Sequence, residues 1–305
     1  MGRYIFKRLG ASVLTLFVVL SLTFFMMRAI PGGPFTDEKS LPPEVMQKVM
    51  ERYKMNDPLG KQYVDYLLNV VKLDLGPSFR YEGRTVNDLI KESFPISAKI
   101  GGLAILISLI VGIPTGIVSA MKRGKFPDKL ASIISVIGVT IPNFVIATIL
   151  IYFFILKLKW ASIGTSKGFL SLLLPAITLA GFPTAFISRI VRSSMLEVIQ
   201  QDYIRTARAK GMLEKKVIYI HALKNALMPV LTYLGPLTAG ILTGSFVVEQ
   251  IFAIPGLGTY FVTSIQNRDY TTILGVTIFY SMLLVTFNLI VDISYALLDS
   301  RIKLE

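Results

Sequence analysis

Cysteine is absent from this sequence of 305 residues, and histidine occurs only once, at His221. Without cysteine the chain has no disulfides, no thiolate metal ligands and no cysteine nucleophile. The phosphate-binding pattern G-x-x-x-x-G-K-[ST] is also missing, because residues 164–168 fail it in spacing and order. We therefore expect no catalytic residue and no metal ligand in this chain. If ATP drives the protein, another chain binds the ATP.

Charge is scarce and unevenly distributed. Charged residues make up 17% of the chain, against about 25% in a typical soluble domain, and hydrophobic residues make up 53%. Six stretches contain no Asp, Glu, Lys or Arg and are long enough to cross a bilayer, which takes about 20 residues. They are residues 9–27, 100–121, 130–156, 168–188, 225–248 and 270–291. None alternates with the period of two expected of a barrel strand, so the sequence predicts an all-α integral membrane protein with six transmembrane helices.

The first apolar stretch resembles the core of a signal peptide, because Arg3, Lys7 and Arg8 precede it. Its 19 uncharged residues exceed the usual length of such a core, and no small-x-small cleavage site follows. We expect residues 1–30 to form an N-terminal tail and a retained first transmembrane helix.

The distribution of Lys and Arg predicts the orientation of the chain in the membrane. If both termini are cytoplasmic, the inner segments hold 17 basic residues and the two short outer loops hold 4. One outer loop, with Lys157, Lys159 and Lys167, runs mildly against this orientation. The net charge of +13 then reflects the usual excess of basic residues in cytoplasmic loops, and no nucleic acid partner is needed to explain it.

Residues 31–98 are too charged to enter lipid and too long for a linker, so we expect a small helical insert on the outer side. Three patterns in it predict helices. They are Pro42 and Pro43 before Val45, Met46, Val49, Met50 and Tyr53; Asp57 and Pro58 before Tyr63, Tyr66, Leu67, Val70 and Val71; and Val86, Leu89, Ile90 and Phe94 before Pro95. The insert is either an ordinary exterior domain or a docking surface for a partner.

Within the spans, the sequence favours a transport pathway over catalysis. Six prolines interrupt the apolar stretches: Pro114, Pro142, Pro175, Pro183, Pro229 and Pro236. Such prolines free backbone carbonyls that neighbouring helices or a water-filled cavity must satisfy. Asp292 is the only acid that we place in or beside a span, so no carboxylate pair for intramembrane proteolysis is evident. We interpret Asp292, near the cytoplasmic end of the last helix, as an interfacial or paired structural acid.

The longest cytoplasmic segment, residues 189–224, has helical patterning on both sides of Gly211. Glycine tolerates a positive φ, so the pattern predicts a sharp helix–turn–helix. The small residues Ala207 and Ala209 permit close approach of another surface. The cations Arg205, Arg208 and Lys210 can steer an acidic partner. On these grounds the segment is either a docking element or a solvated basic loop.

The same segment resembles the cytoplasmic EAA loop of ABC importer permeases, whose pattern is E-A-A, three residues, G, nine residues, I-x-L-P. Arg205, Thr206 and Ala207 are followed three residues later by Gly211, and nine residues further on by His221, Ala222, Leu223 and Lys224. Ala207, Gly211 and Leu223 match the pattern. Arg205, Thr206, His221 and Lys224 depart from it, in the manner expected of the peptide-importer branch.

Three further stretches are similar to the B-type permeases of the oligopeptide, dipeptide and nickel family. They are Phe25-Met-Met-Arg-Ala-Ile-Pro-Gly32; Asn56-Asp-Pro-Leu59 with Gln62-Tyr63 and Asp74-Leu-Gly-Pro-Ser-Phe79; and Gly244-Ser-Phe-Val-Val-Glu249 with Ile251-Phe-Ala-Ile-Pro-Gly-Leu-Gly258 and Asn267-Arg-Asp-Tyr270. The family residues of the outer loop are Glu249, Pro255, Gly256, Gly258, Arg268, Asp269 and Tyr270.

The resemblance implies a type I ABC importer permease fold. It divides the chain into the first helix (1–30), the extracytoplasmic insert (31–98), the permease core (94–298) with its EAA-like loop (203–224), and a cytoplasmic tail (299–305). It also implies a multi-pass protein of the prokaryotic cytoplasmic membrane. The implied partners are a second, homologous permease, two ATPase subunits that bind ATP and magnesium, and an extracytoplasmic solute-binding protein.

The implied function is ATP-driven import of oligopeptides or dipeptides. The same machinery serves oligosaccharides or nickel in related branches, and the binding protein selects the substrate. An ion-coupled secondary transporter is a further alternative, which dependence on co-expressed ATPase subunits distinguishes from an ABC importer. A membrane enzyme would require activity from this chain alone.

Overall fold

The computed structural model describes residues 2–30, 47–48, 50–51, 53, 55–164 and 169–298. Most of the first helix expected in the insert, including Val45, Met46 and Val49, lies outside the described residues, as does the expected tail at 299–305. The described residues form helices joined by turns, with one isolated antiparallel bridge between Pro77 and Thr85. The helices are α1 (Gly2–Ala29), α3 (Leu59–Val71), α4 (Val86–Met121), α5 (Phe126–Thr140), α6 (Asn143–Leu150), the π-helix η1 (Ile151–Lys157), α7 (Phe169–Val198), α8 (Asp202–Ala209), α9 (Glu214–Lys216), the π-helix η2 (Val217–Ala222), α10 (Leu223–Ala226), α11 (Met228–Leu242), α12 (Phe246–Ile251), α13 (Leu257–Gln266) and α14 (Tyr270–Leu298).

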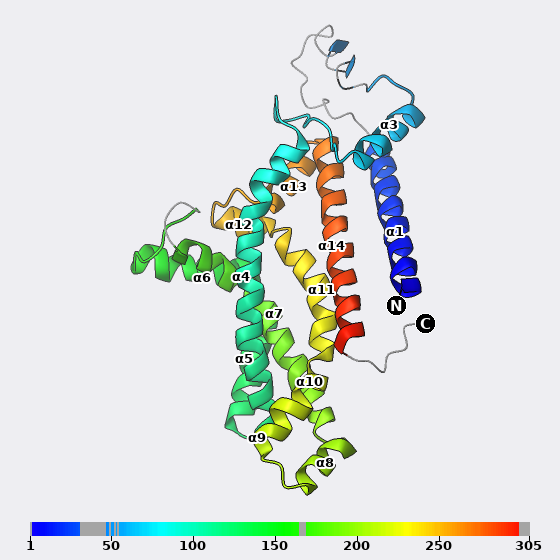
Figure 1. Cartoon of the computed structure of the whole chain (residues 1–305). Helices are drawn as coiled ribbons and strands as arrows, with labels where there is room; N and C mark the ends of the chain where they lie inside the picture. Colours follow the sequence, from blue (N-terminus) through cyan, green and yellow to red (C-terminus); the bar gives the residue numbers. More distant parts are fainter. Residues whose placement is uncertain are drawn as a thin grey trace.

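Four of the six expected spans are confirmed as single helices that are long and apolar enough to cross a membrane. They are Phe6–Ala29, Val86–Met121, Phe169–Val198 and Tyr270–Ser294. The other two expected spans correspond to helix pairs that bend sharply, which brings the number of spans to as many as six. Figure 1 shows α3 at one end of the molecule and α8 at the other, and these ends are called the α3 end and the α8 end below.

The expected third span, residues 130–156, corresponds to a pair of helices with a sharp bend between them. Its two halves, Phe126–Thr140 and Asn143–Lys157, meet at 102°. Pro142 causes the break, because it has no backbone N–H and forces the preceding Ile141 into an extended conformation, with φ −78° and ψ 123°. As a result α6 and η1 project sideways from the bundle (Figure 1).

The expected fifth span, residues 225–248, is also divided. The segments Glu214–Ala226 and Met228–Leu242 bend by 47°, with Pro229 in the first turn of α11. The span ends at Leu242 because the chain turns at Gly244, where φ is +91°. Val248, expected inside the span, belongs to the separate short helix α12.

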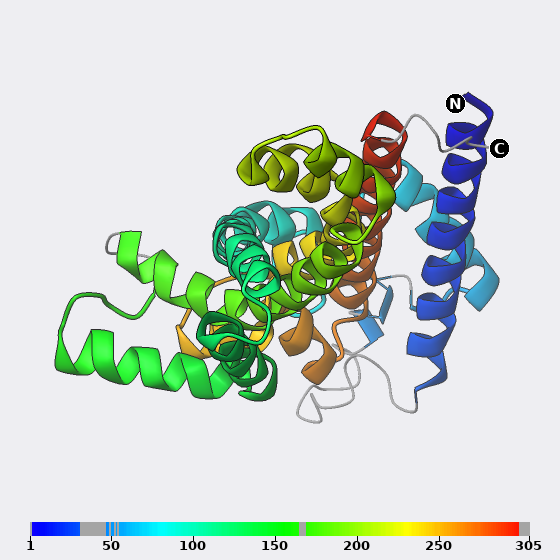
Figure 2. The ribbon, with the colours of Figure 1, turned by 90° about the horizontal axis from the view of Figure 1, so that it is seen from below.

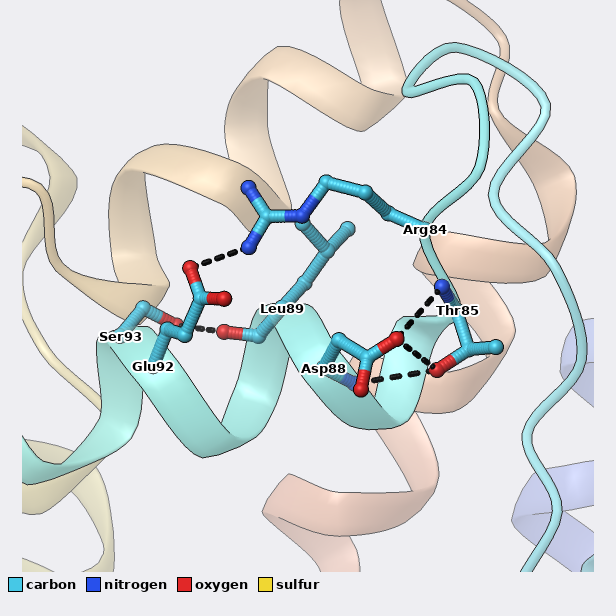
Figure 3. Close-up of polar contacts among 6 residues, drawn as sticks. All are labelled: Arg84, Thr85, Asp88, Leu89, Glu92 and Ser93. Carbon is cyan, nitrogen blue, oxygen red and sulfur yellow. Dashed lines mark hydrogen bonds and ion pairs between the residues drawn. The ribbon is translucent and has the colours of Figure 1, made fainter.

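The start of α4 explains why the insert merges with the permease core. Thr85 and Asp88 form a reciprocal capping box, in which the Asp88 amide donates to Thr85 Oγ1 at 3.2 Å and the Thr85 amide donates to Asp88 Oδ2 at 3.0 Å (Figure 3). Arg84 pairs with Glu92 one turn further on. From this cap α4 continues through Pro95 for 36 residues, so the expected insert boundary at residue 98 falls inside one continuous helix.

The centre of the bundle is the packing of α4 against α7, the most extensive helix contact among the described residues. Gly112 and Gly116 lie one turn apart on the contact face. A Cβ atom at Gly116 would lie 2.6 Å from the carbonyl oxygen of Ser188, and one at Gly112 would lie 2.9 Å from that of Thr184. Only glycine permits this approach of two backbones, as in the small-xxx-small packing of membrane helices.

The first helix stands at the edge of the bundle. Figure 2 shows α1 on one side of the molecule and α6 on the opposite side. Helix α1 packs against α14, and it contacts the insert through stacking of Phe24 on Tyr66 and a 2.6 Å hydrogen bond between Ser21 and Tyr63. The outward face of α1 carries exposed apolar side chains, including Val13, Leu14 and Phe17, which suits a lipid-facing helix.

Candidate docking loop and buried carboxylate clusters

The turn after α8 forms around Gly211, as the sequence predicts. Gly211 has φ +73°, and its amide donates to the Arg208 carbonyl at 2.9 Å. The Met212 amide donates to the Ala207 carbonyl at 3.3 Å. These two bonds are those of a Schellman motif, which ends a helix with a left-handed residue. The 203–224 loop is therefore a helix, a sharp turn and a returning helical segment (α9, η2 and α10).

The two faces of α8 have different environments. Ile204 is fully buried and Ala207 is 7% exposed, and both pack with Val217 and Ile218 in a core cluster that also includes Met195. The side chain of Ala207 faces this core, so the close approach that its small size was expected to permit is made with its own bundle. The exposed face carries Arg205, Thr206, Arg208, Ala209 and Lys210.

Two of the three cations that were expected to steer an acidic partner already lie beside an acid of this chain. Arg208 binds Glu214 through two hydrogen bonds, from Nη2 at 2.7 Å and from Nε at 3.1 Å. These bonds raise the pKa of Arg208, so it stays charged. Arg205 lies 3.5 Å from Asp202, both being exposed. Lys210 has no ion pair within the part of the chain that the structure describes.

The two remaining residues expected in the coupling motif lie on the returning segment. Leu223, at the start of α10, packs against the same core cluster as Ala207. His221 lies in η2 and is half-buried. The loop is thus held to the bundle by Leu223, Ile204 and Ala207, and it presents the charged face of α8 to its surroundings.

Glu249, in α12, holds together three elements near the α3 end. Its carboxylate accepts from Ser97 of α4 at 2.7 Å and from the Thr259 amide at 2.9 Å. Ser97 in turn accepts from the Leu257 amide at 2.9 Å. The carboxylate therefore lies at the N-terminus of α13, where free amides and the helix dipole stabilise a negative charge.

The glycines of the outer-loop motif make room for this carboxylate. Added Cβ atoms at Gly244 and at Gly256 would collide with the Glu249 side chain, and one at Gly258 would lie 2.8 Å from the Phe246 amide nitrogen. Pro255 precedes the N-cap Gly256 and is exposed. The motif is thus a compact turn folded around one buried acid.

Asp269 forms a second buried carboxylate cluster, at the N-terminus of α14. It accepts from Ser78 Oγ at 2.5 Å and from the Phe79 amide at 3.1 Å, both in the insert. It also accepts from Thr272, through Oγ1 at 2.8 Å and the amide at 3.2 Å. The carboxylate joins the turn that leads into α4 to the last transmembrane helix.

The neighbours of Asp269 in the expected motif have structural positions. Arg268 adopts φ +55°, which turns the chain into α14. Tyr270 is 3% exposed, and the Arg28 guanidinium lies 5.8 Å from the centre of its ring. The sequence singles out Asp269 by family resemblance only, since its partner Ser78 is 191 residues away.

Asp128 is a site that the sequence interpretation missed. It lies in the first turn of α5 and is 5% exposed, so Asp292 is not the only acid in or beside a span. Its Oδ1 and Oδ2 accept from Arg192 of α7 at 2.7 Å and 3.0 Å, and Ser119 of α4 donates to Oδ1 at 2.6 Å. The signal in the sequence is Pro127 followed by an acid, which is typical of a helix start.

Asp292 is confirmed as a paired acid. It forms an ion pair with Arg8 at 3.1 Å, which joins the beginning of α1 to the last part of α14. Among the described residues, no group of three His, Asp or Glu side chains converges as a metal site would require.

Two family models match the chain. The one described as binding-protein-dependent transport system inner membrane component matches residues 112–304. The other, described as binding-protein-dependent transport system membrane component, N-terminal, matches residues 1–101.

Similar proteins extend over the whole chain. The dipeptide transport system permease protein DppB of Bacillus subtilis is 47% identical over 305 residues, with 100% of this chain and 99% of the relative covered. The oligopeptide transport system permease protein OppB of Haemophilus influenzae is 43% identical over 305 residues, with 99% and 100% covered. A structure of the MetNI methionine ABC transporter in an inward-facing conformation matches with a TM-score of 0.58 and 18% identity, over 69% of this chain and 96% of that chain.

The helical membrane bundle, with its projecting helix–turn–helix, is the fold of a type I ABC importer permease. The protein is therefore a membrane subunit of a transporter. The chain belongs to the family of binding-protein-dependent transport system inner membrane components.

Proposed function

We propose that this chain is the B-type permease subunit of an ABC importer that carries dipeptides or oligopeptides across the cytoplasmic membrane. The observation that supports this function most directly is the likeness to a dipeptide permease, 47% identical from end to end. The substrate class follows from the names of such relatives. Oligosaccharides or nickel would require the same machinery with another binding protein.

The energy comes from separate ATPase subunits, which bind ATP and magnesium, and the 203–224 loop is their docking element. Support comes from the geometry of α8, which projects from the α8 end of the bundle (Figure 1). Its exposed face carries Arg205, Arg208 and Lys210, and its buried face fixes it to the bundle. A rigidly held, charged helix can transmit the movement of a partner to the spans.

The α8 end is cytoplasmic in this proposal, and both termini lie on the same side. The excess of Lys and Arg in the segments of that side, 17 against 4 in the short loops of the other, supports the orientation. The ion pair between Arg8 and Asp292 is consistent with it, because it places the start of α1 beside the last part of α14.

The pathway forms between this chain and a second, homologous permease, and an extracytoplasmic solute-binding protein delivers the substrate. The family description names dependence on a binding protein, which supports the solute-binding protein as a partner. With up to six spans among the described residues, this chain supplies half of the bundle that encloses the path.

The experiment is uptake of a labelled dipeptide by proteoliposomes that contain this chain, its second permease and both ATPase subunits, with the binding protein added outside. ATP inside a vesicle population of the matching orientation should drive uptake. A complex whose ATPase subunits cannot hydrolyse ATP serves as the control. Uptake of an oligosaccharide or of nickel with no uptake of peptides would overturn the substrate class. Uptake driven by an ion gradient without ATP would overturn the transporter class.

A further inference from the structure

A polar cavity of about 230 Å³ lies between α4, α5 and α7, near the α8 end of the molecule. Six of its eight lining residues are polar, although it is bounded by three membrane helices. The polar residues that line it are Ser119, Ser132, Ser135, Ser188, Arg189 and Arg192. We call this space the Arg189 cavity.

The two arginines of the cavity differ in their partners. Arg192 is held by Asp128, with Nε at 2.7 Å and Nη2 at 3.0 Å from the two carboxylate oxygens. Arg189 is exposed and makes no hydrogen bond or ion pair within the described ranges. The cavity therefore contains one cation whose charge is not compensated by a neighbouring acid.

Two serine hydroxyls that line the cavity also make no hydrogen bond to the described residues. Ser135 is 3% exposed and Ser188 is 4% exposed, and neither hydroxyl makes a hydrogen bond within the part of the chain that is described. Other buried hydroxyls of the same helices bond to the carbonyl one turn back, as Ser108 and Thr178 do at 2.7 Å and 3.0 Å. Because both residues line the cavity and make no hydrogen bond to the described residues, their hydroxyls are available to a ligand that enters it.

This combination of groups suits an anionic oxygen ligand. A guanidinium binds carboxylate and phosphate oxygens strongly, and hydroxyl donors add further hydrogen bonds. A cation does not suit the cavity, because none of the described residues that line it is an acid and Asp128 is already occupied by Arg192, Ser119 and the Gly124 amide. An ionisable residue of a membrane helix commonly marks a functional site when it faces a cavity and has no acidic partner.

We propose that the Arg189 cavity binds a carboxylate or a phosphate through Arg189, Ser135 and Ser188. Two sources supply this chemistry: the C-terminal carboxylate of a transported peptide, and the phosphate of an anionic lipid headgroup. The first source rests on the proposed function, and the second does not depend on it.

The variant that tests the cavity is Arg189→Gln, which removes the charge without leaving a buried partner unpaired. The matched control is Arg123→Gln, since Arg123 is an exposed arginine in the α4–α5 turn that does not line the cavity. A second variant, Ser135→Ala with Ser188→Ala, keeps the charge and removes the two free hydroxyls. Each is assembled into the complete complex before measurement.

The first arm measures uptake of trialanine and of trialanine amide at saturating concentration, where differences in capture by the binding protein no longer affect the rate. If the cavity receives the peptide carboxylate, Arg189→Gln slows uptake of trialanine more than uptake of trialanine amide. The ratio of the trialanine rate to the amide rate then falls about tenfold relative to wild type, as the loss of a charged hydrogen bond predicts. The serine variant also lowers this ratio, and Arg123→Gln leaves the ratio unchanged.

The second arm measures binding of phosphatidylglycerol to the delipidated complex by native mass spectrometry, with phosphatidylcholine as the uncharged reference. If the cavity receives a lipid headgroup, Arg189→Gln weakens the preference for phosphatidylglycerol about tenfold, and Arg123→Gln does not. Equal behaviour of Arg189→Gln and Arg123→Gln in both arms overturns the proposal. Absence of peptide uptake by the wild type refutes the proposed function alone, and the second arm then decides the cavity.

Discussion

Gly211 determines where α8 ends and where the loop turns back. No atom lies within 4 Å of the position that its Cβ would take, so an added Cβ meets no steric obstacle. The cost of a side chain there arises from the backbone, whose φ of +73° is unfavourable for any residue with a Cβ. This cost is about 1 kcal/mol, and more for a β-branched residue, which is small beside the packing of the whole bundle.

We predict that Gly211→Val leaves expression and membrane insertion intact and weakens binding of the ATPase subunits, because the strained turn reorients α8. The measurement is pull-down of the ATPase subunits from detergent extracts. The control is Gly83→Val at the α3 end, where φ is +74° and the surroundings are equally open. Equal ATPase binding by Gly211→Val and Gly83→Val would argue against a docking role of the loop.

Ala207 and Ala209 lie two residues apart and face opposite environments. Ala207 is 7% exposed in the core cluster, whereas Ala209 is exposed. We predict that Ala209→Asp weakens ATPase binding and leaves the thermal stability of the purified chain unchanged. Ala207→Asp should lower that stability by about 1–3 kcal/mol, because it buries a carboxylate without a partner. Loss of stability in Ala209→Asp would place both residues in the core and remove the surface argument for docking.

Three buried acids share one arrangement, and it explains why the sequence located their roles only in part. Glu249, Asp269 and Asp128 each lie in or beside the N-terminal turn of a helix and accept from a serine hydroxyl, which for the first two acids belongs to a distant segment. The partners Ser97 and Ser78 are separated from their acids by 152 and 191 residues. Family resemblance could single out the first two acids, but single-sequence patterns contain no information about such distant pairs.

At the scale of the elements, the apolar stretches predicted the four long spans because their length alone is diagnostic. The bends were not predictable in the same way. Helix α4 continues through Pro95, whereas the chain turns by 102° at Pro142. The difference is tertiary, because Ile90, Ser93 and Ser97 on both sides of Pro95 are buried against neighbouring elements.

The contact of α4 with α7 provides a test of the bundle at this scale. Gly116 lies on the contact face, where an added Cβ would be 2.6 Å from a backbone oxygen, and Gly102 lies on the open face of the same helix. We predict that Gly116→Ala lowers stability by about 1–3 kcal/mol through overpacking, although alanine favours helices. Gly102→Ala should leave stability unchanged or raise it. Thermal unfolding in detergent measures both, and equal midpoints would contradict the close packing of these backbones.

At the scale of the whole molecule, the absence of cysteine permits a direct test of orientation. We predict that Glu82→Cys reacts with an impermeant thiol reagent added to whole cells whose outer membrane, if present, is permeabilised. Lys125→Cys should react only after lysis. Both positions are exposed, at the α3 end and the α8 end respectively. Ser78 is unsuitable although it belongs to the same insert, because it is 1% exposed and binds Asp269. Labelling of Lys125→Cys before Glu82→Cys would reverse the orientation.

The molecule as a whole also predicts that the chain cannot act alone. Its sequence contains no phosphate-binding loop. Up to six segments of the described residues can span a membrane, whereas an enclosed pathway between bundles needs about twice that number. Helix α8 projects from the bundle with an exposed charged face that is accessible to another chain. The purified chain in vesicles should therefore show neither ATP hydrolysis nor peptide flux. Adding the second permease, the ATPase subunits and the binding protein should restore both activities together. Flux through the chain alone, driven by a proton or sodium gradient, would instead indicate a secondary transporter whose pathway lies within a single copy or between two copies of this chain.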